Sequence, residues 1–74
     1  MPISKPDRIK EIRIKQGYSI RAISLKAGLS YSTVAYLEKK PRAVAPRTAK
    51  LLCDALDIPF DEAFTIVGTA SEGR

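Results

Sequence analysis

The stretch that decides the fold is SIRAISLKAGLSYSTVAYLE, residues 19–38. Ser19 and Ser30 each precede an apolar pattern with helical spacing. A serine in that position caps a helix, because its hydroxyl accepts a hydrogen bond from a free backbone N–H of the first turn. Gly28 lies between the two helices and can adopt the positive φ that a tight turn requires. The stretch therefore predicts two short helices at a fixed crossing, with one face of the second projecting outward.

The outward face of the second helix has an unusual composition for a solvated surface. It carries hydroxyls, phenols, one methyl group and one cation, and no acid precedes Glu38. Its residues are Tyr31, Ser32, Thr33, Ala35, Tyr36 and Lys39. A helix that reads a DNA groove needs short donors and acceptors near its N-terminus and cations toward the phosphates. This face is therefore predicted to be a contact surface.

The rest of the chain predicts further short helices and no strand. Asp7 is the expected cap of the first helix, and Pro46 suits the first turn of the fourth. The expected helices span residues 8–16, 20–27, 31–40, 46–56 and 60–67. The expected shared core consists of Ile20, Ile23, Ala27, Leu29, Val34, Leu37, Leu52, Leu56 and Phe64. The predicted fold class is all-α, with a flexible N-terminal arm at residues 1–6, one domain at residues 7–67 and a flexible tail at residues 68–74.

Charge is distributed unevenly along the chain. Residues 1–50 hold twelve Lys and Arg and three acids, whereas residues 51–74 hold one Arg and five acids. A basic body of this kind favours a polyanion as partner, although a solvated charged surface gives the same count.

Composition also argues against several classes of protein. There is no histidine, and Cys53 is the only cysteine, so neither a disulfide within the chain nor a metal site is expected. We expect Cys53 to be a small core residue. No catalytic constellation or glycine-rich phosphate loop is present, so we expect neither an enzyme nor a cofactor nor a small-molecule substrate. No apolar run is long enough for a signal peptide or a membrane span, which favours a cytoplasmic protein without a membrane partner.

Three stretches resemble the lambda-repressor-like family, also described as Cro-type or XRE-type helix-turn-helix proteins. They are IKEIRIKQGYS, ISLKAGLSYSTVAYLE and LCDALDIPFDEAF, and the resemblance extends over residues 9–64. It implies a compact five-helix DNA-binding bundle with the helix-turn-helix in the second and third helices, and double-stranded DNA as the partner.

The resemblance also implies roles for individual residues. Base contact is expected from Tyr31, Ser32 and Tyr36, unless a tyrosine packs on the body of the protein instead. Contact with the DNA backbone is expected from Ser19, Arg21, Ser30, Thr33, Lys39, Lys40, Arg42 and Arg47. Within that group, Ser30 has capping as an alternative role, Thr33 has support of the turn, and Arg47 has the minor groove.

Two further positions follow from the family pattern. Arg13 and Glu38 match a pair that forms an internal salt bridge in relatives, which would lock the third helix onto the first. Ile20 stands where the family often has a glutamine that holds a phosphate. That departure leaves the phosphate to backbone N–H groups after Ser19 and to Arg21.

A single module of this size contacts few base pairs, so we expect a homodimer that reads a palindromic operator as a repressor. The expected dimer interface consists of Ile58, Pro59, Phe60, Ile66 and Val67, and the alternative is that these residues only close the core of the monomer. The alternative is a protein-binding module with the same fold, such as an antitoxin or a modulator of a larger repressor.

Overall fold

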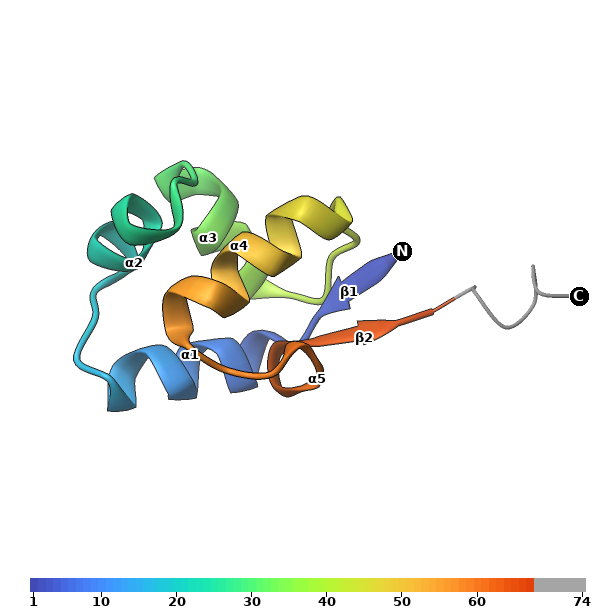
Figure 1. The fold of residues 1–74 in the computed structure, drawn as a ribbon, viewed down its shortest axis with the longest axis horizontal. Helices are drawn as coiled ribbons and strands as arrows, with labels where there is room; N and C mark the ends of the chain where they lie inside the picture. Colours follow the sequence, from blue (N-terminus) through green and yellow to red (C-terminus); the bar gives the residue numbers. More distant parts are fainter. Residues whose placement is uncertain (68–74) are drawn as a thin grey trace, which may run out of the picture.

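The computed structural model describes residues 1–67, which form five helices and a small two-stranded sheet (Figure 1). The elements in chain order are β1 (Pro2–Ser4), α1 (Pro6–Lys15), α2 (Ile20–Ala27), α3 (Tyr31–Lys39), α4 (Pro46–Leu56), α5 (Phe60–Ala63) and β2 (Phe64–Ile66). The prediction of five helices is confirmed. No helix in this part of the chain has both the length and the apolar character needed to cross a membrane.

Capping and backbone geometry define the turn between α2 and α3. The hydroxyl of Ser19 accepts from the N–H of Ala22 at 3.0 Å, and that of Ser30 accepts from the N–H of Thr33 at 3.2 Å. Gly28 ends α2 with φ of 73°, in the left-handed region that a side chain would strain. These residues fix where α2 begins and ends and where α3 begins, as the sequence predicted, whereas α3 ends at Lys39, one residue earlier than expected.

The core lies where α2 packs against α3 and α4, and where α1 packs against α3 and α5. Seven of the nine predicted core residues are buried, whereas Ile20 and Leu29 are partly buried and pack against the core. Ile9, Ala49, Cys53, Ala55 and Ala63 complete it. The Phe60 and Phe64 rings stack at its edge, with centroids 5.5 Å apart. Burial of this apolar surface is the main force that holds the short helices together.

The two-stranded sheet corrects the prediction that the chain contains no strand. β1 pairs antiparallel with β2, with Ile3 opposite Thr65 and Ser4 opposite Phe64. The expected arm at residues 1–6 thus holds a strand and the start of α1. Likewise, the helix expected at residues 60–67 ends at Ala63. The physical reason is that the sequence after Ala63 is FTIV, in which β-branched side chains favour extended backbone once a partner strand is available.

The start of α1 is a second correction. Asp7 is not its cap, because the helix begins at Pro6 and Lys5 occupies the capping position without a side-chain bond. Proline favours an extended conformation in the residue before it and suits the first helical position. Asp7 lies in the first turn instead, where its charge favours the helix N-terminus. The tail expected at residues 68–74 lies outside the described residues.

Candidate nucleic-acid interface

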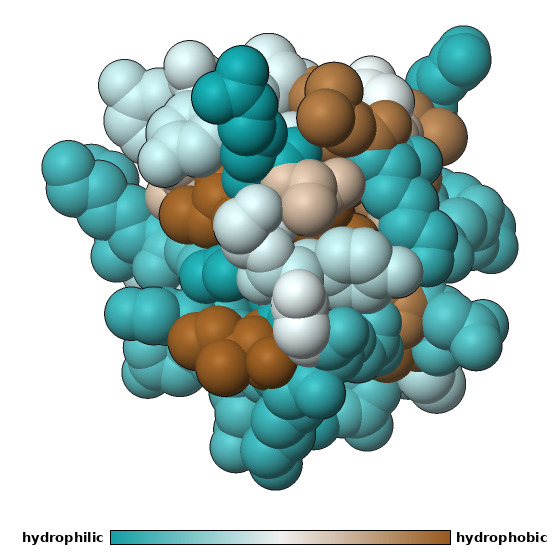
Figure 2. Space-filling model, turned by 90° about the vertical axis from the view of Figure 1, so that its left-hand side faces the viewer, coloured by the Kyte–Doolittle hydropathy of each residue, from teal (hydrophilic) through white to brown (hydrophobic). Residues whose placement is uncertain are grey.

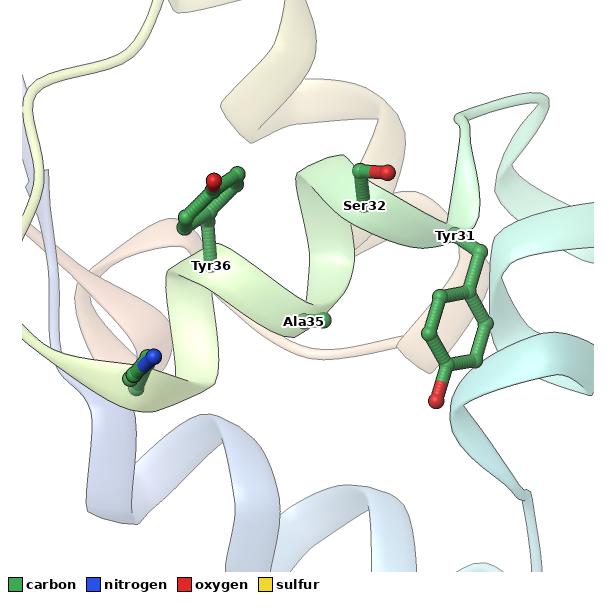
Figure 3. Close-up of a pocket in the computed structure, with 5 residues that line it drawn as sticks. Tyr31, Ser32, Ala35 and Tyr36 are labelled. Carbon is green, nitrogen blue, oxygen red and sulfur yellow. The ribbon is translucent and has the colours of Figure 1, made fainter.

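The outer face of α3 presents two tyrosines to solvent. Tyr31 is 57% exposed and Tyr36 is 50% exposed, so neither ring is packed into the core. Figure 3 shows the two phenols pointing to different sides of the helix, with Ala35 between them and Ser32 on the first turn. The three residues that were expected to contact bases, Tyr31, Ser32 and Tyr36, are therefore all exposed on the outer face of α3.

The ring of Tyr36 also has a cation over it. The guanidinium carbon of Arg42 lies 4.6 Å from the ring centroid, a distance typical of a cation–π contact. Sequence reasoning assigned Arg42 only to the DNA backbone and missed this contact. The contact with Arg42 restricts the side-chain conformations of Tyr36, so the ring is preorganised before any DNA binds.

Ser4 is a second residue that sequence reasoning missed. Its hydroxyl donates to the carbonyl of Lys40 at 3.4 Å, although the two residues are 36 positions apart. Ser4 is buried, and it therefore joins β1 to the basic loop that follows α3. The only signal in the sequence is a small polar residue inside a short extended segment between two prolines.

The capping hydroxyls are occupied within the protein. Ser30 Oγ and Thr33 Oγ1 lie 2.7 Å apart in addition to the Ser30 cap, so each hydroxyl already has a partner in the turn. Ser24 is buried inside α2, and its hydroxyl donates to the carbonyl of Ile20 at 2.7 Å. Ser30 and Thr33 thus support the turn, and any contact with a phosphate would share or replace these bonds.

The ion pair expected between Arg13 and Glu38 is present. Arg13 Nε donates to one carboxylate oxygen of Glu38 at 2.6 Å and Nη2 donates to the other at 2.9 Å. Both side chains are about nine-tenths buried, and Arg13 Nη1 also donates to the carbonyl of Tyr18 at 2.7 Å. The hydrogen bond that Arg13 donates to Glu38 raises the pKa of Arg13 above its ordinary value, so the guanidinium stays charged. The pair joins α1 to the end of α3 and so fixes the orientation of the recognition helix.

The basic side chains fall into two groups. The first group, on α1 and α4, forms ion pairs at the surface. Arg8 pairs with Glu11 and Glu62, Lys15 pairs with Glu11, and Lys50 pairs with Asp54. A second group is exposed and has no salt bridge within residues 1–67. It includes Arg21, Lys39, Lys40, Arg42 and Arg47, which were all expected to contact the DNA backbone, and also Lys10 and Lys26, which were not.

The surface around α2 is largely polar. Figure 2 views the molecule from the α2 end, where hydrophilic side chains cover most of the surface and apolar side chains form separate small areas. A polar surface of this kind suits a charged partner such as a nucleic acid. It is less suited to a protein partner, whose interface would place apolar side chains at its centre.

The residues expected at a dimer interface lie around α5 and β2, at the other end of the long axis from α2 (Figure 1). Ile58 and Phe60 are partly buried against the core, so part of their surface is already used. Pro59, Ile66 and Val67 are exposed. An apolar hollow also lies here, lined by Met1, Pro2, Pro46, Phe60 and Ile66.

Cys53 is buried in the core, as expected for a small apolar residue. Burial raises the pKa of its thiol to about 11, so the reactive thiolate is scarce at neutral pH.

Comparison with known proteins agrees with this geometry. The family model described as helix-turn-helix matches residues 9–62, most of the segment over which the sequence resembles that family. A solved structure, the restriction-modification controller protein C.AhdI from Aeromonas hydrophila, has 32% sequence identity to this chain and a TM-score of 0.71. That match covers 77% of this chain and 86% of the controller protein. No curated protein matches the chain. The chain therefore belongs to the XRE-type helix-turn-helix family and has its lambda-repressor-like fold, as a DNA-binding transcriptional regulator.

Proposed function

We propose that this protein is a homodimeric repressor that reads a palindromic operator through the major groove. The observation that carries the proposal is the outer face of α3, where two half-exposed tyrosines and Ser32 lie beside cations without ion-pair partners in residues 1–67. A recognition helix needs this combination, because hydroxyls read base edges while cations position the helix against phosphates.

In this proposal Tyr31, Ser32 and Tyr36 contact bases. Lys39, Lys40 and Arg42 contact phosphates at the C-terminal side of α3, and Arg47 contacts either a phosphate or the minor groove. The backbone N–H groups at the start of α2 hold a phosphate in place of the missing glutamine side chain, with Ser19 and Arg21 beside them. Ser30 and Thr33 contribute to backbone contact only where their hydroxyls can bond the phosphate as well as each other.

The proposed dimer places one recognition helix in each of two successive major grooves, about 34 Å apart. Ile66 and Val67 support an interface at β2, because they are about half exposed beside the apolar hollow that Phe60 helps to line. Ile58 and Pro59 extend the same surface. A dimer also doubles the number of base contacts, which a module of this size needs to select one site in a genome.

The decisive experiment is selection of retained sequences from random duplexes over a series of salt concentrations. Enrichment of a palindrome with half-sites one helical turn apart is the expected result. Binding without sequence preference that disappears as salt rises would overturn the proposal, because it would reduce the basic face to nonspecific attraction. A reporter gene placed behind the selected site then distinguishes repression from activation.

The dimer has a separate test in analytical ultracentrifugation. Ile66→Glu places a charge in the proposed interface and should shift the protein toward monomer. Ile14→Glu is the matched control, because Ile14 is similarly exposed, at 55%, but lies on α1. Equal effects of the two substitutions, or none, would contradict an interface at β2.

The similarity to a restriction-modification controller bears on the regulated genes. At 32% identity over most of both chains, it favours restriction-modification genes as the target of this regulator. Binding of the protein to DNA upstream of its own gene and of its neighbours would test this assignment. As a regulator of this kind the protein acts in the cytoplasm, without catalysis of its own.

A second candidate function is that of a protein-binding module, an antitoxin or a modulator of a larger repressor. Ile20 favours it, because an isoleucine at the usual phosphate-binding position cannot bond a phosphate. The distinguishing result is a tight stoichiometric complex with a protein that survives Tyr36→Ala and Arg42→Ala. Loss of that complex in either variant would tie the partner to the DNA-reading face.

A further inference from the structure

The outer face of α3 contains a hollow of defined chemistry. Its walls are the phenols of Tyr31 and Tyr36, and Ser32 and Lys39 complete the rim. Ala35 lies between the two phenols, on the part of the helix that faces the viewer in Figure 3. The shortest side chain that lines the hollow is therefore a methyl group, and the other four lining residues can all donate hydrogen bonds.

The four base pairs differ in how well they suit this hollow. In the major groove thymine presents a methyl group beside a carbonyl acceptor, O4. The methyl of Ala35 can pack against the first, while the Ser32 hydroxyl or the Lys39 ammonium donates to the second. Cytosine presents a donor in place of O4, which suits a lysine poorly. Guanine and adenine present N7 but no methyl, so they leave the Ala35 methyl without an apolar partner.

We infer that the hollow over Ala35 receives the 5-methyl group of a thymine, so that Ala35 is a specificity-determining residue. This inference rests on the proposed function, since it assigns one base of the operator to one position of the recognition helix. The inference states which base enters the hollow that Tyr31 and Tyr36 flank. The proposed function requires only that the protein prefers some DNA sequence.

The test replaces single thymines of the selected operator by deoxyuridine, which removes the methyl and leaves O4 unchanged. One thymine in each half-site should be sensitive, with binding about fourfold weaker, the effect expected for loss of one buried methyl group. Deoxyuridine at other positions should leave affinity unchanged. The quantity compared is the ratio of affinities for the thymine and deoxyuridine operators, measured by fluorescence anisotropy for each protein variant.

Protein variants link the sensitive thymine to Ala35. In Ala35→Gly the ratio should fall from about four to about one, because the methyl of thymine has lost its partner. Glycine also weakens the helix, so Ala35→Ser serves as a second variant and should lower the ratio as well. Ala22→Gly, on the exposed surface of α2, is the control for helix weakening and should leave the ratio at about four.

The outcomes separate this inference from the proposed function. A selected palindrome in which no thymine is sensitive to deoxyuridine would overturn the inference and leave the proposed function standing. A sensitive thymine with the same ratio in the Ala35 variants would also overturn it, because another residue would then hold the methyl. Absence of any selected sequence would overturn both.

Discussion

Ser4 and Arg42 are joined by two hydrogen bonds, one through the side chain and one through the backbone of Ser4. The N–H of Arg42 donates to Ser4 Oγ at 3.0 Å, and the N–H of Ser4 donates to the carbonyl of Arg42 at 2.9 Å. Since Arg42 stacks on Tyr36, the N-terminal strand is connected through a single loop residue to a side chain of the recognition face. In addition to its pairing with β2, the strand thus positions Arg42 against Tyr36, a residue proposed to contact bases.

Ser4→Ala should impair DNA binding more than its distance from the recognition helix suggests. The substitution leaves the part-buried N–H of Arg42 without its acceptor, which costs at most roughly 1 to 3 kcal/mol, the range for a fully buried donor. The loop can relieve that cost by moving, and the stack of Arg42 on Tyr36 then loosens. We expect a several-fold loss of affinity for the selected operator at constant salt, measured on protein that is fully folded at the assay temperature.

Ser24→Ala is the matched control for that experiment. Ser24 is as deeply buried as Ser4, at 3% exposure, but its hydroxyl bonds only the carbonyl of Ile20 within α2. This variant should keep its affinity for the operator. Parallel losses in both variants would mean that general destabilisation, and not the position of Arg42, explains the effect of Ser4→Ala.

The ion pair between Arg13 and Glu38 should show strong coupling in a double-mutant cycle. Arg13→Met leaves the carboxylate of Glu38 buried without a counter-charge, and Glu38→Leu does the same to the guanidinium of Arg13, so we expect each to lose about 3 kcal/mol or more in the free energy of unfolding. The double variant Arg13→Met with Glu38→Leu should recover most of that loss, because it removes both charges and keeps the volume. Urea denaturation measures both. Additive losses would show that the two side chains act independently.

The sequence predicted those parts of the fold that depend on local signals. Ser19, Ser30 and Gly28 mark the helix-turn-helix by capping and by positive φ, which need only neighbouring residues. The family pattern similarly identified Arg13 and Glu38. The strands were missed because each has three residues and is too short to show alternation. Their pairing depends on bringing the two ends of the fold together, which no local pattern reports.

For the candidate site too, the sequence predicted what depends on neighbouring residues and missed what depends on long-range contacts. Helical spacing predicted Tyr31 and Tyr36 on the outer face of α3 but left open whether either ring packs on the body of the protein, and their exposure in the structure excludes burial of either ring. The contact between Arg42 and Tyr36 depends on the path of the loop after α3, and that path depends on Ser4 in β1. Long-range contacts of this kind follow from the assembled fold and not from residue spacing.

The two groups of cations should differ in their effect on the salt dependence of DNA binding. Lys40→Ala removes an exposed cation at the end of α3 that has no ion pair within residues 1–67. The slope of log affinity against log salt should become shallower by roughly 0.9, the value for one lost phosphate contact. Titrations of the selected operator at several salt concentrations give the slope.

Lys15→Ala is the control of the same residue type for the salt series. Lys15 lies on α1 with its ammonium 3.4 Å from a carboxylate oxygen of Glu11, and 73% of the side chain is exposed. We expect its slope to equal that of the unchanged protein. An equal change of slope in both variants would contradict the proposal that Lys40 contacts a phosphate and that the ion-paired Lys15 does not.

The Cys53 thiol should make stability depend on pH in the alkaline range. Burial, the largest influence, raises its pKa from 9.0 to about 11, so the folded protein holds this proton more tightly than the unfolded chain does. The contribution of the protonated thiol to stability is therefore fully present below pH 9 and is lost as the pH rises through 11. A difference of two units between the two pKa values corresponds to a loss of roughly 2 to 3 kcal/mol in the free energy of unfolding. Cys53→Ala removes the thiol and keeps every other ionisable side chain. Urea denaturation from pH 8 to 11 should therefore show a smaller decline in the variant, and parallel declines would contradict the shift.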